Sequence, residues 1–211
     1  MSLKQFTVIR HRWTFIVWFF LCSTLSANAS PATPSAQFAA DSFLNNLSGV
    51  NLVDQHGKPF EPGSLQNQVI LFNFIFTRCG STCPIQTKSL AQVFTKLPAD
   101  VRDRVRFVSI SIDPENDTSA KLQAFSHAMG ADLDGWSFLT GDPKQIEELT
   151  QRLHLFDESD SNEATRPQIH RTSLWLVDKQ GRMLQRYKGD PPDNERLIRE
   201  LTQVSRMANQ S

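Results

Sequence analysis

The feature that most constrains the fold is an apolar run that ends directly before two closely spaced cysteines. Val69–Phe76 reads VILFNFIF, which is typical of a strand buried on both faces. Cys79 and Cys83 follow at once, and Pro84 stands where a first-turn helix proline is tolerated. Apolar residues then recur at helical spacing: Leu90, Val93, Phe94 and Leu97. We therefore expect the cysteines at a strand-to-helix turn, where open α/β sheets place their sites.

The rest of the chain continues this alternation of strands and helices. Strands are predicted at 105–112 and 136–140, and helices at about 118–129, 143–153 and 193–207. Two turn signals predict hairpins, one joining 50–53 to Phe60 and one joining 173–177 to 183–187. Strand–helix repeats followed by a hairpin and a helix predict an α/β fold, with a central sheet flanked by helices and an N-terminal hairpin extension.

Residues 1–29 resemble an export signal more than folded structure. Three basic residues precede an apolar run at 13–25, and no acidic residue occurs before Ala29. The run has signal-peptide length and is short for a membrane span, which needs about 20 residues. Cleavage is expected after Ala29, and retention as a short anchor is the alternative. The predicted location is the periplasm or the outer face of the inner membrane.

The expected mature chain is one domain with little net charge. Serine, alanine and proline dominate the start of 30–44, which is predicted to be a flexible lead-in to a domain at 45–207. Loss of the signal's three basic residues from the total of 22 would leave 19 basic against 22 acidic residues, or about −3. No Lys/Arg-rich block is present, so nothing indicates nucleic-acid binding.

Cysteine usage narrows the chemistry. Of three cysteines, Cys22 lies in the signal, and a lipoprotein role for it is disfavoured because Leu21 precedes it. Cys79 and Cys83 remain, only four positions apart. Two cysteines in an oxidising compartment often form a structural disulfide. A bridge that closes so small a loop would stabilise weakly, so a redox pair or a metal site is favoured.

The predicted position of the two thiols suits both uses. Free amides and the macrodipole at a helix N-terminus lower thiol pKa values, and Arg78 adds a neighbouring positive charge. Side chains at i and i+4 on a helix have Cβ atoms about 5–6 Å apart, whereas a disulfide needs roughly 3.8 Å. A metal bridges the longer gap more easily. The spacing favours a metal site that can also be oxidised.

Two thiolates select Cu(I) or zinc and need a third ligand, for which histidine is the natural candidate. His11 would leave with the signal. His170 enters a predicted strand from a long polar loop at 157–168 and is the stronger candidate. The remaining histidines have ordinary turn, helix-face or helix-end explanations: His56, His127 and His154.

Three motifs together resemble the Sco/SenC family over roughly residues 45–205. They are TRCGSTCP at 77–84, SISIDPENDT at 109–118, and IHRT at 169–172 before a strand, followed by Asp178 and Gly181. The resemblance implies a thioredoxin-like fold with a mixed central sheet. It also implies copper, as Cu(I) or Cu(II), held by Cys79, Cys83 and His170.

The same resemblance implies a client. Members of the family deliver copper to the dinuclear copper site of cytochrome c oxidase, or keep the cysteines of that site reduced. The expected partner is therefore subunit II of the oxidase, or another copper-accepting protein, near a membrane. We expect mainly a metallochaperone, with a thiol-disulfide reductase as the alternative. A peroxidase or a metal-free binding module is less compatible with the motif.

Two further points concern residues around the motif. The resemblance places Asp113 near the metal loop, where it would influence copper or partner handling; alternatively it caps the turn formed with Pro114. Gly80 and Ser81 depart from the Pro-Asp pair common in the family. Neither is a ligand, so this difference bears on redox potential and partner recognition rather than on copper binding.

Overall fold

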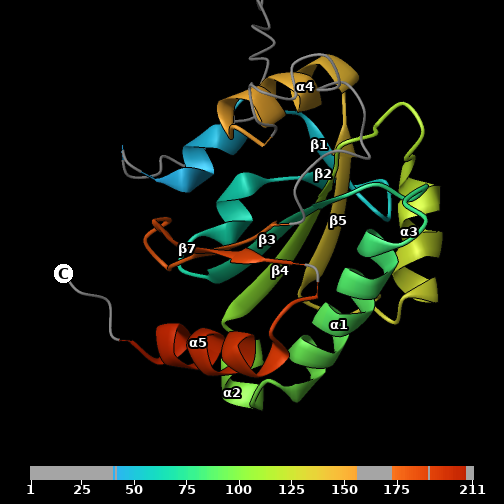
Figure 1. The fold of residues 1–211 in the computed structure, drawn as a ribbon. Coiled ribbons are helices and arrows are strands. Elements are labelled where there is room, and N and C mark those ends of the chain that lie inside the picture. The colour runs from blue at the N-terminus through green and yellow to red at the C-terminus, as the bar shows by residue number, and fades with distance from the viewer. Residues whose placement is uncertain (1–39, 41, 156–172, 190, 208–211) are drawn as a thin grey trace, which may run out of the picture. The chain divides into compact units, whose positions relative to one another are not determined.

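The computed structural model describes residues 40, 42–155, 173–189 and 191–207, and Figure 1 shows their arrangement. A seven-stranded mixed sheet forms the centre, in the order β2-β1-β5-β4-β3-β6-β7. The strands are β1 (Leu52–Asp54), β2 (Pro59–Phe60), β3 (Val69–Ile75), β4 (Val105–Ser111), β5 (Trp136–Gly141), β6 (Ser173–Val177) and β7 (Met183–Lys188). The predicted α/β class, mixed sheet and N-terminal hairpin are confirmed.

Helices cover both faces of this sheet. The α-helices are α1 (Thr82–Lys96), α2 (Ala99–Arg102), α3 (Ser119–Ala128), α4 (Pro143–Arg152) and α5 (Asn194–Arg206), with 3-10 helices η1 (Phe43–Leu47) and η2 (Pro62–Leu65). The sequence did not predict α2, η1 or η2, which are single turns. Phe43 and Leu44 are buried, so the packed structure begins before the expected domain start at residue 45. The domain limits themselves stay a prediction, and residues 1–39 lie outside the described part.

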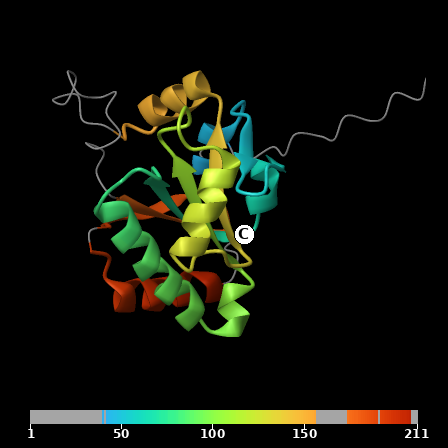
Figure 2. The same ribbon diagram turned by 90° about the vertical axis from the view of Figure 1, so that its right-hand side faces the viewer.

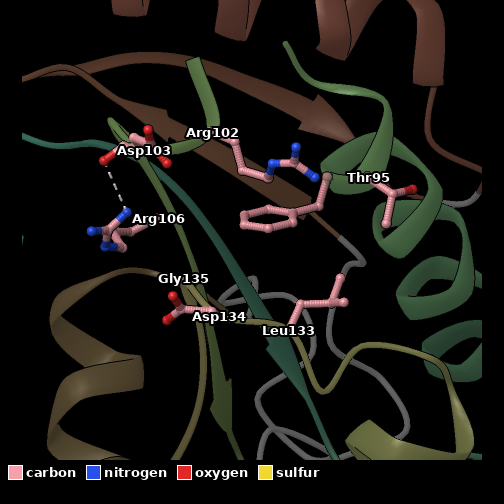
Figure 3. Close-up of a pocket in the computed structure, with 8 residues that line it drawn as sticks. Thr95, Arg102, Asp103, Arg106, Leu133, Asp134 and Gly135 are labelled. Atoms are coloured by element: carbon pink, nitrogen blue, oxygen red, sulfur yellow. Dashed lines mark hydrogen bonds between the residues drawn. The ribbon is translucent and has the colours of Figure 1, made fainter. Parts of the chain in front are cut away.

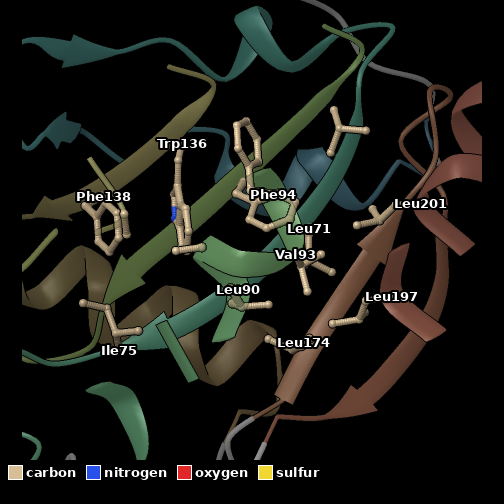
Figure 4. Close-up of a cluster of buried hydrophobic side chains, with 14 of the residues drawn as sticks. Leu71, Ile75, Leu90, Val93, Phe94, Trp136, Phe138, Leu174, Leu197 and Leu201 are labelled. Atoms are coloured by element: carbon tan, nitrogen blue, oxygen red, sulfur yellow. The ribbon is translucent and has the colours of Figure 1, made fainter. Parts of the chain in front are cut away.

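β3 divides the core because its side chains alternate between the two faces of the sheet. Val69, Leu71 and Ile75 join the cluster under α1, α3 and α5, part of which Figure 4 shows. Ile70, Phe72 and Phe74 join the second cluster, under η1 and α4. In Figure 2, α1 and α3 lie side by side on the near face. A strand buried on both faces fits the centre of the sheet, where β3 pairs with β4 in parallel and with β6 antiparallel.

One polar residue interrupts the apolar run of β3. The amide of Asn73 donates to Gln86 of α1 at 2.9 Å and accepts from the hydroxyl of Ser109 at 2.6 Å. The indole of Trp136 donates to the same hydroxyl at 2.9 Å, and Gln86 donates to the carbonyl of Gly189 at 3.0 Å. These satisfied, buried contacts join the start of α1 to β3 and to the residue after β7, and they link β3 to β4 and β5.

Candidate metal and thiol site

Cys79 and Cys83 lie at the carboxyl end of β3, as predicted. Cys79 is in the turn after the strand, where its backbone amide donates to the carbonyl of Phe76 at 3.2 Å. Cys83 is the second residue of α1, which begins at Thr82. Cys79 is therefore not on the helix, and the i, i+4 helical geometry assumed from the spacing is wrong. Both cysteines are free thiols.

The thiol of Cys79 caps the start of α1. The backbone amide of Cys83 donates to the Cys79 sulfur at an N–Sγ distance of 3.3 Å. Ser81 holds the N-cap position but makes no side-chain capping bond. A sulfur therefore accepts from an amide that a serine or aspartate oxygen usually satisfies. This contact brings Cys79 to the first turn of α1, beside Cys83.

The two thiols differ in exposure and acidity. Cys79 is partly exposed, whereas Cys83 is 0% exposed. Burial opposes ionisation of Cys79, but hydrogen bonds from the amides of Cys83 and Ser81 stabilise the thiolate, so the pKa of Cys79 lies below its ordinary value. Burial raises the pKa of Cys83 to about 12, and the charges of Cys79 and Asp117 act in the same direction. The expectation that the helix start activates both thiols is wrong for Cys83.

Asp113 contacts, through Arg78, the turn at residues 77–81 that carries Cys79, here called the cysteine turn. Its Oδ2 accepts from Nε and Nη2 of Arg78 at 3.0 and 2.8 Å, and its Oδ1 accepts from the Asn116 side chain at 2.8 Å. The carboxylate thus joins its own turn to the residue before Cys79, and its influence on copper or partner handling stays a prediction. The Arg78 guanidinium pairs with this carboxylate.

Asp117 is a second acidic residue at the site, and no role for it was predicted from the sequence. It is 0% exposed and accepts from the amide and hydroxyl of Thr77 and the hydroxyl of Ser111. The available signal was its place within the motif at 109–118, four residues after Asp113. Sequence spacing alone does not show that a residue after β4 contacts a residue after β3.

The predicted third ligand, His170, lies outside the described residues, as does the polar loop at 157–168. Within the described part of the chain, no three His, Cys, Asp or Glu side chains gather as a metal site. The other described histidines are exposed: His56 is in the β1–β2 turn, His127 is in α3, and His154 follows α4. The two cysteines therefore supply two soft donors, as a Cu(I) or zinc site requires.

A pocket of about 410 Å³ lies elsewhere (Figure 3). It is lined by Phe94 and Thr95 of α1, by Arg102, Asp103 and Arg106, and by the turn Leu133–Gly135. Thr95 is near the C-terminal end of α1, roughly 18 Å along the helix from Cys83 at 1.5 Å per residue. The pocket is lined by side chains of both charges, and the Arg106 guanidinium donates to the backbone oxygen of Asp103 at 3.3 Å. This pocket is separate from the cysteine turn.

Among the described helices, none is long and apolar enough to cross a membrane.

Comparisons with known proteins agree with this geometry. The family model described as SCO1/SenC matches residues 47–206. A SCO1 protein homolog of Bacillus subtilis is 34% identical over 139 residues, which cover 64% of this chain and 70% of the homolog.

Two solved structures show the same fold. BsSco, described as a member of the Sco family of cytochrome c oxidase assembly proteins with a disulfide switch, has a TM-score of 0.62 and 30% identity. The match covers 75% of this chain and 92% of BsSco. Bradyrhizobium japonicum ScoI, solved with copper bound, has a TM-score of 0.61 and 24% identity, over 74% of this chain and 96% of ScoI. The motif, the thioredoxin-like fold and the family match lead to one conclusion: the chain belongs to the SCO1/SenC family.

Proposed function

We propose that the protein is a copper metallochaperone that binds copper through Cys79, Cys83 and His170. The observation that carries the proposal is the pairing of a partly exposed sulfur with a buried one at a strand-to-helix turn. Two thiolates and an imidazole form a three-coordinate set that suits Cu(I), and Cu(II) would add an oxygen donor. The copper-bound structure of the related ScoI supports the choice of metal.

Copper is cargo in this proposal, so it must leave as well as bind. An incoming acceptor thiolate can reach the partly exposed Cys79 directly. Displacement of one donor at a time keeps the ion coordinated throughout the exchange. The acceptor we propose is the dinuclear copper site on subunit II of cytochrome c oxidase, in line with the assembly role described for BsSco. An export signal at 1–29 would place the protein on the periplasmic side of the inner membrane, where it would meet this acceptor.

Anaerobic Cu(I) competition titration of the reduced protein tests the proposal. We expect tight one-to-one binding that Cys79→Ser and Cys83→Ser both abolish. His170→Ala should weaken binding less than either cysteine change, because thiolates are the stronger Cu(I) ligands. His127→Ala is the matched control, since His127 is exposed on α3. Weak Cu(I) binding that is the same in His170→Ala and wild type would contradict the proposed copper site.

A second candidate function, thiol-disulfide reduction, is favoured by the asymmetry between the two cysteines. The partly exposed Cys79 would attack one sulfur of a target disulfide and release the other target sulfur as a thiolate. Cys83, after losing its proton, would attack the Cys79 sulfur and release the second target thiolate. The target gains two electrons, and the protein is left with a Cys79–Cys83 disulfide that a thiol reductant must regenerate. The disulfide switch described for BsSco is consistent with such a state.

His170 separates the two functions. Reduction of a model disulfide needs both cysteines but not the imidazole, so His170→Ala should reduce the substrate at the wild-type rate while binding copper more weakly. Loss of reduction in His170→Ala as complete as that in Cys79→Ser would contradict the reductase mechanism. The two functions share residues, and copper loading of an acceptor requires its thiols to be reduced.

A further inference from the structure

The buried carboxylate of Asp117 holds the first residue of the cysteine turn from a different loop. Its Oδ2 accepts from the backbone amide of Thr77 at 3.0 Å and from the hydroxyl of Ser111 at 2.6 Å. Its Oδ1 accepts from the hydroxyl of Thr77 at 2.5 Å. All three donors are uncharged, and Asp117 is 0% exposed. A carboxylate buried in this way is stable only because its hydrogen bonds are satisfied.

Thr77 lies two residues before Cys79, so its position directs the chain toward the sulfur. On the other side of Cys79, Gly80 and Ser81 are exposed. A Cβ added at Gly80 would meet nothing within 4 Å, and Ser81 makes no capping bond. Little packing therefore restrains the turn after Cys79. The restraint comes from the residues before it, and Asp117 makes two of those contacts.

We propose that Asp117 is a positioning residue, which acts through Thr77 to hold the Cys79 sulfur at the first turn of α1. The inference deepens the proposed function, because a fixed sulfur pair both binds copper and closes a disulfide more readily than a loose pair. Asp113 restrains the next residue, Arg78, whose side chain is 58% exposed. The contacts between Asp117 and Thr77, in contrast, lie inside the protein, because Asp117 is fully buried.

Substitutions at Asp117 separate its contacts from its charge. In Asp117→Asn, the amide oxygen can still accept from the Thr77 amide and Ser111, and the amide nitrogen can donate to the Thr77 hydroxyl. This variant keeps the contacts and loses the charge, whereas Asp117→Ala loses both. A positioning role predicts that asparagine restores function and alanine does not.

The experiment measures the Cys79–Cys83 disulfide equilibrium against dithiothreitol in the metal-free protein, together with Cu(I) affinity. In the forward direction the two protein thiols give two electrons and two protons to oxidised dithiothreitol. We expect Asp117→Ala to lower both constants about tenfold, the effect of roughly one lost hydrogen bond to a charged group. Asp117→Asn should stay within about twofold of wild type on the same scale.

Asp178→Ala is the matched control for general loss of stability. Asp178 is also a buried carboxylate, and it accepts from the amides of Gln180 and Arg182 at 3.0 and 2.8 Å. Asp178 follows β6, whose last residue Val177 pairs with Ile70 near the start of β3. It therefore lies at the end of β3 opposite to the end that the cysteines follow. This variant should unfold at lower temperature and leave both sulfur constants unchanged.

Two results would overturn the inference: constants in Asp117→Ala equal to those of wild type, or Asp117→Asn as impaired as Asp117→Ala. If Asp117→Ala does not fold, Thr77→Val and Thr77→Ser decide, since only serine keeps the hydroxyl donor. Absence of Cu(I) binding in the wild type would refute the proposed function instead. The disulfide equilibrium would still decide the role of Asp117.

Discussion

The backbone amide of Cys83 donates a hydrogen bond to the thiol sulfur of Cys79 at 3.3 Å. This contact makes one cysteine the cap of the helix that carries the other. It stabilises a negative charge on Cys79, because an amide hydrogen bond and the helix N-terminus both favour the thiolate. It does nothing comparable for Cys83, whose sulfur is buried. The two sulfurs are therefore prepared for different steps.

The first prediction concerns alkylation of the reduced, metal-free protein. Iodoacetamide should modify Cys79 faster than Cys83 by a factor on the order of one hundred at neutral pH. The lowered pKa of Cys79 should place the midpoint of its pH–rate profile below that of the urea-unfolded chain, and the pKa of Cys83, about 12, should keep that residue protonated. Peptide mapping by mass spectrometry measures both rates. Equal rates in the folded protein would contradict the asymmetry.

The second prediction concerns the Arg78–Asp113 pair. Asp113→Ala should lower the free energy of unfolding by about 1–2 kcal/mol, because it also leaves the Asn116 side chain without its acceptor. Arg78→Gln should cost only about 0.5 kcal/mol, since the Arg78 side chain is mostly exposed and solvent screens its charge. Urea unfolding of both single variants and the double variant gives the coupling energy. A coupling that does not weaken in 1 M salt would show that the ion pair is not the interaction being measured.

The third prediction concerns the buried polar chain beside the site. Ser109→Ala should cost about 2 kcal/mol of unfolding free energy, because it removes the hydroxyl that accepts from the Trp136 indole and donates to the Asn73 side-chain oxygen. Ser126→Ala is the control, since that buried serine donates only within its own helix, to the carbonyl of Gln123. Urea denaturation should show the larger loss for Ser109→Ala. Equal losses would mean that the chain across the strands adds nothing to stability.

The fourth prediction compares two glycines. Gly181 has φ +80°, and an added Cβ would lie 2.0 Å from the Ser42 hydroxyl oxygen. Gly181→Ala should therefore cost about 2–3 kcal/mol. Gly80 has open space around it, so Gly80→Ala should change stability by less than about 0.5 kcal/mol. Thermal unfolding of both variants tests the contrast, and comparable melting temperatures would refute it.

The fifth prediction rests on the proposed copper delivery. Ile85, in the first turn of α1, is 54% exposed beside the cysteines, where an acceptor must approach. Ile85→Ser should slow copper transfer to a subunit II acceptor several-fold, on the order of one lost apolar contact. It should leave Cu(I) affinity unchanged. Leu184→Ser is the control, because Leu184 is similarly exposed (45%) but lies on the edge strand β7, far from the cysteines in the sequence. This change should not slow transfer.

Much of the fold follows from local patterns in the sequence. The apolar run of β3 and the periodicity of α1 predicted the strand-to-helix turn, and that prediction placed both cysteines at the carboxyl end of β3. The helix α2 was missed because four residues after Pro98 carry no usable period. Gln86 and Asn73 were missed as partners because a polar residue inside an apolar run shows its contact only in three dimensions.

The position of the two cysteines in the fold was predictable from the sequence, but their environment was not. The sequence indicated Cys79 and Cys83 as the candidate residues, and analogy with thioredoxin-like sites favoured Cys79 as the more exposed, attacking thiol. Their difference arises from burial under the rest of the fold and from the hydrogen bonds that backbone amides donate to the Cys79 sulfur, neither of which spacing encodes. The role of Asp117 depends on two loops that follow neighbouring parallel strands, and the register of β3 and β4 brings those loops together.

The complete burial of Cys83 gives the site an order of events. A molecule arriving from solvent meets the sulfur of Cys79 first, and the inner sulfur becomes reachable only once the outer one has been displaced. Copper release would then begin at the surface and end inside, with the inner cysteine as the last protein donor to let go. The same order applies to a mixed disulfide, which would form at the outer residue and be resolved from within. The burial of one sulfur would thus set the order in which the two cysteines react.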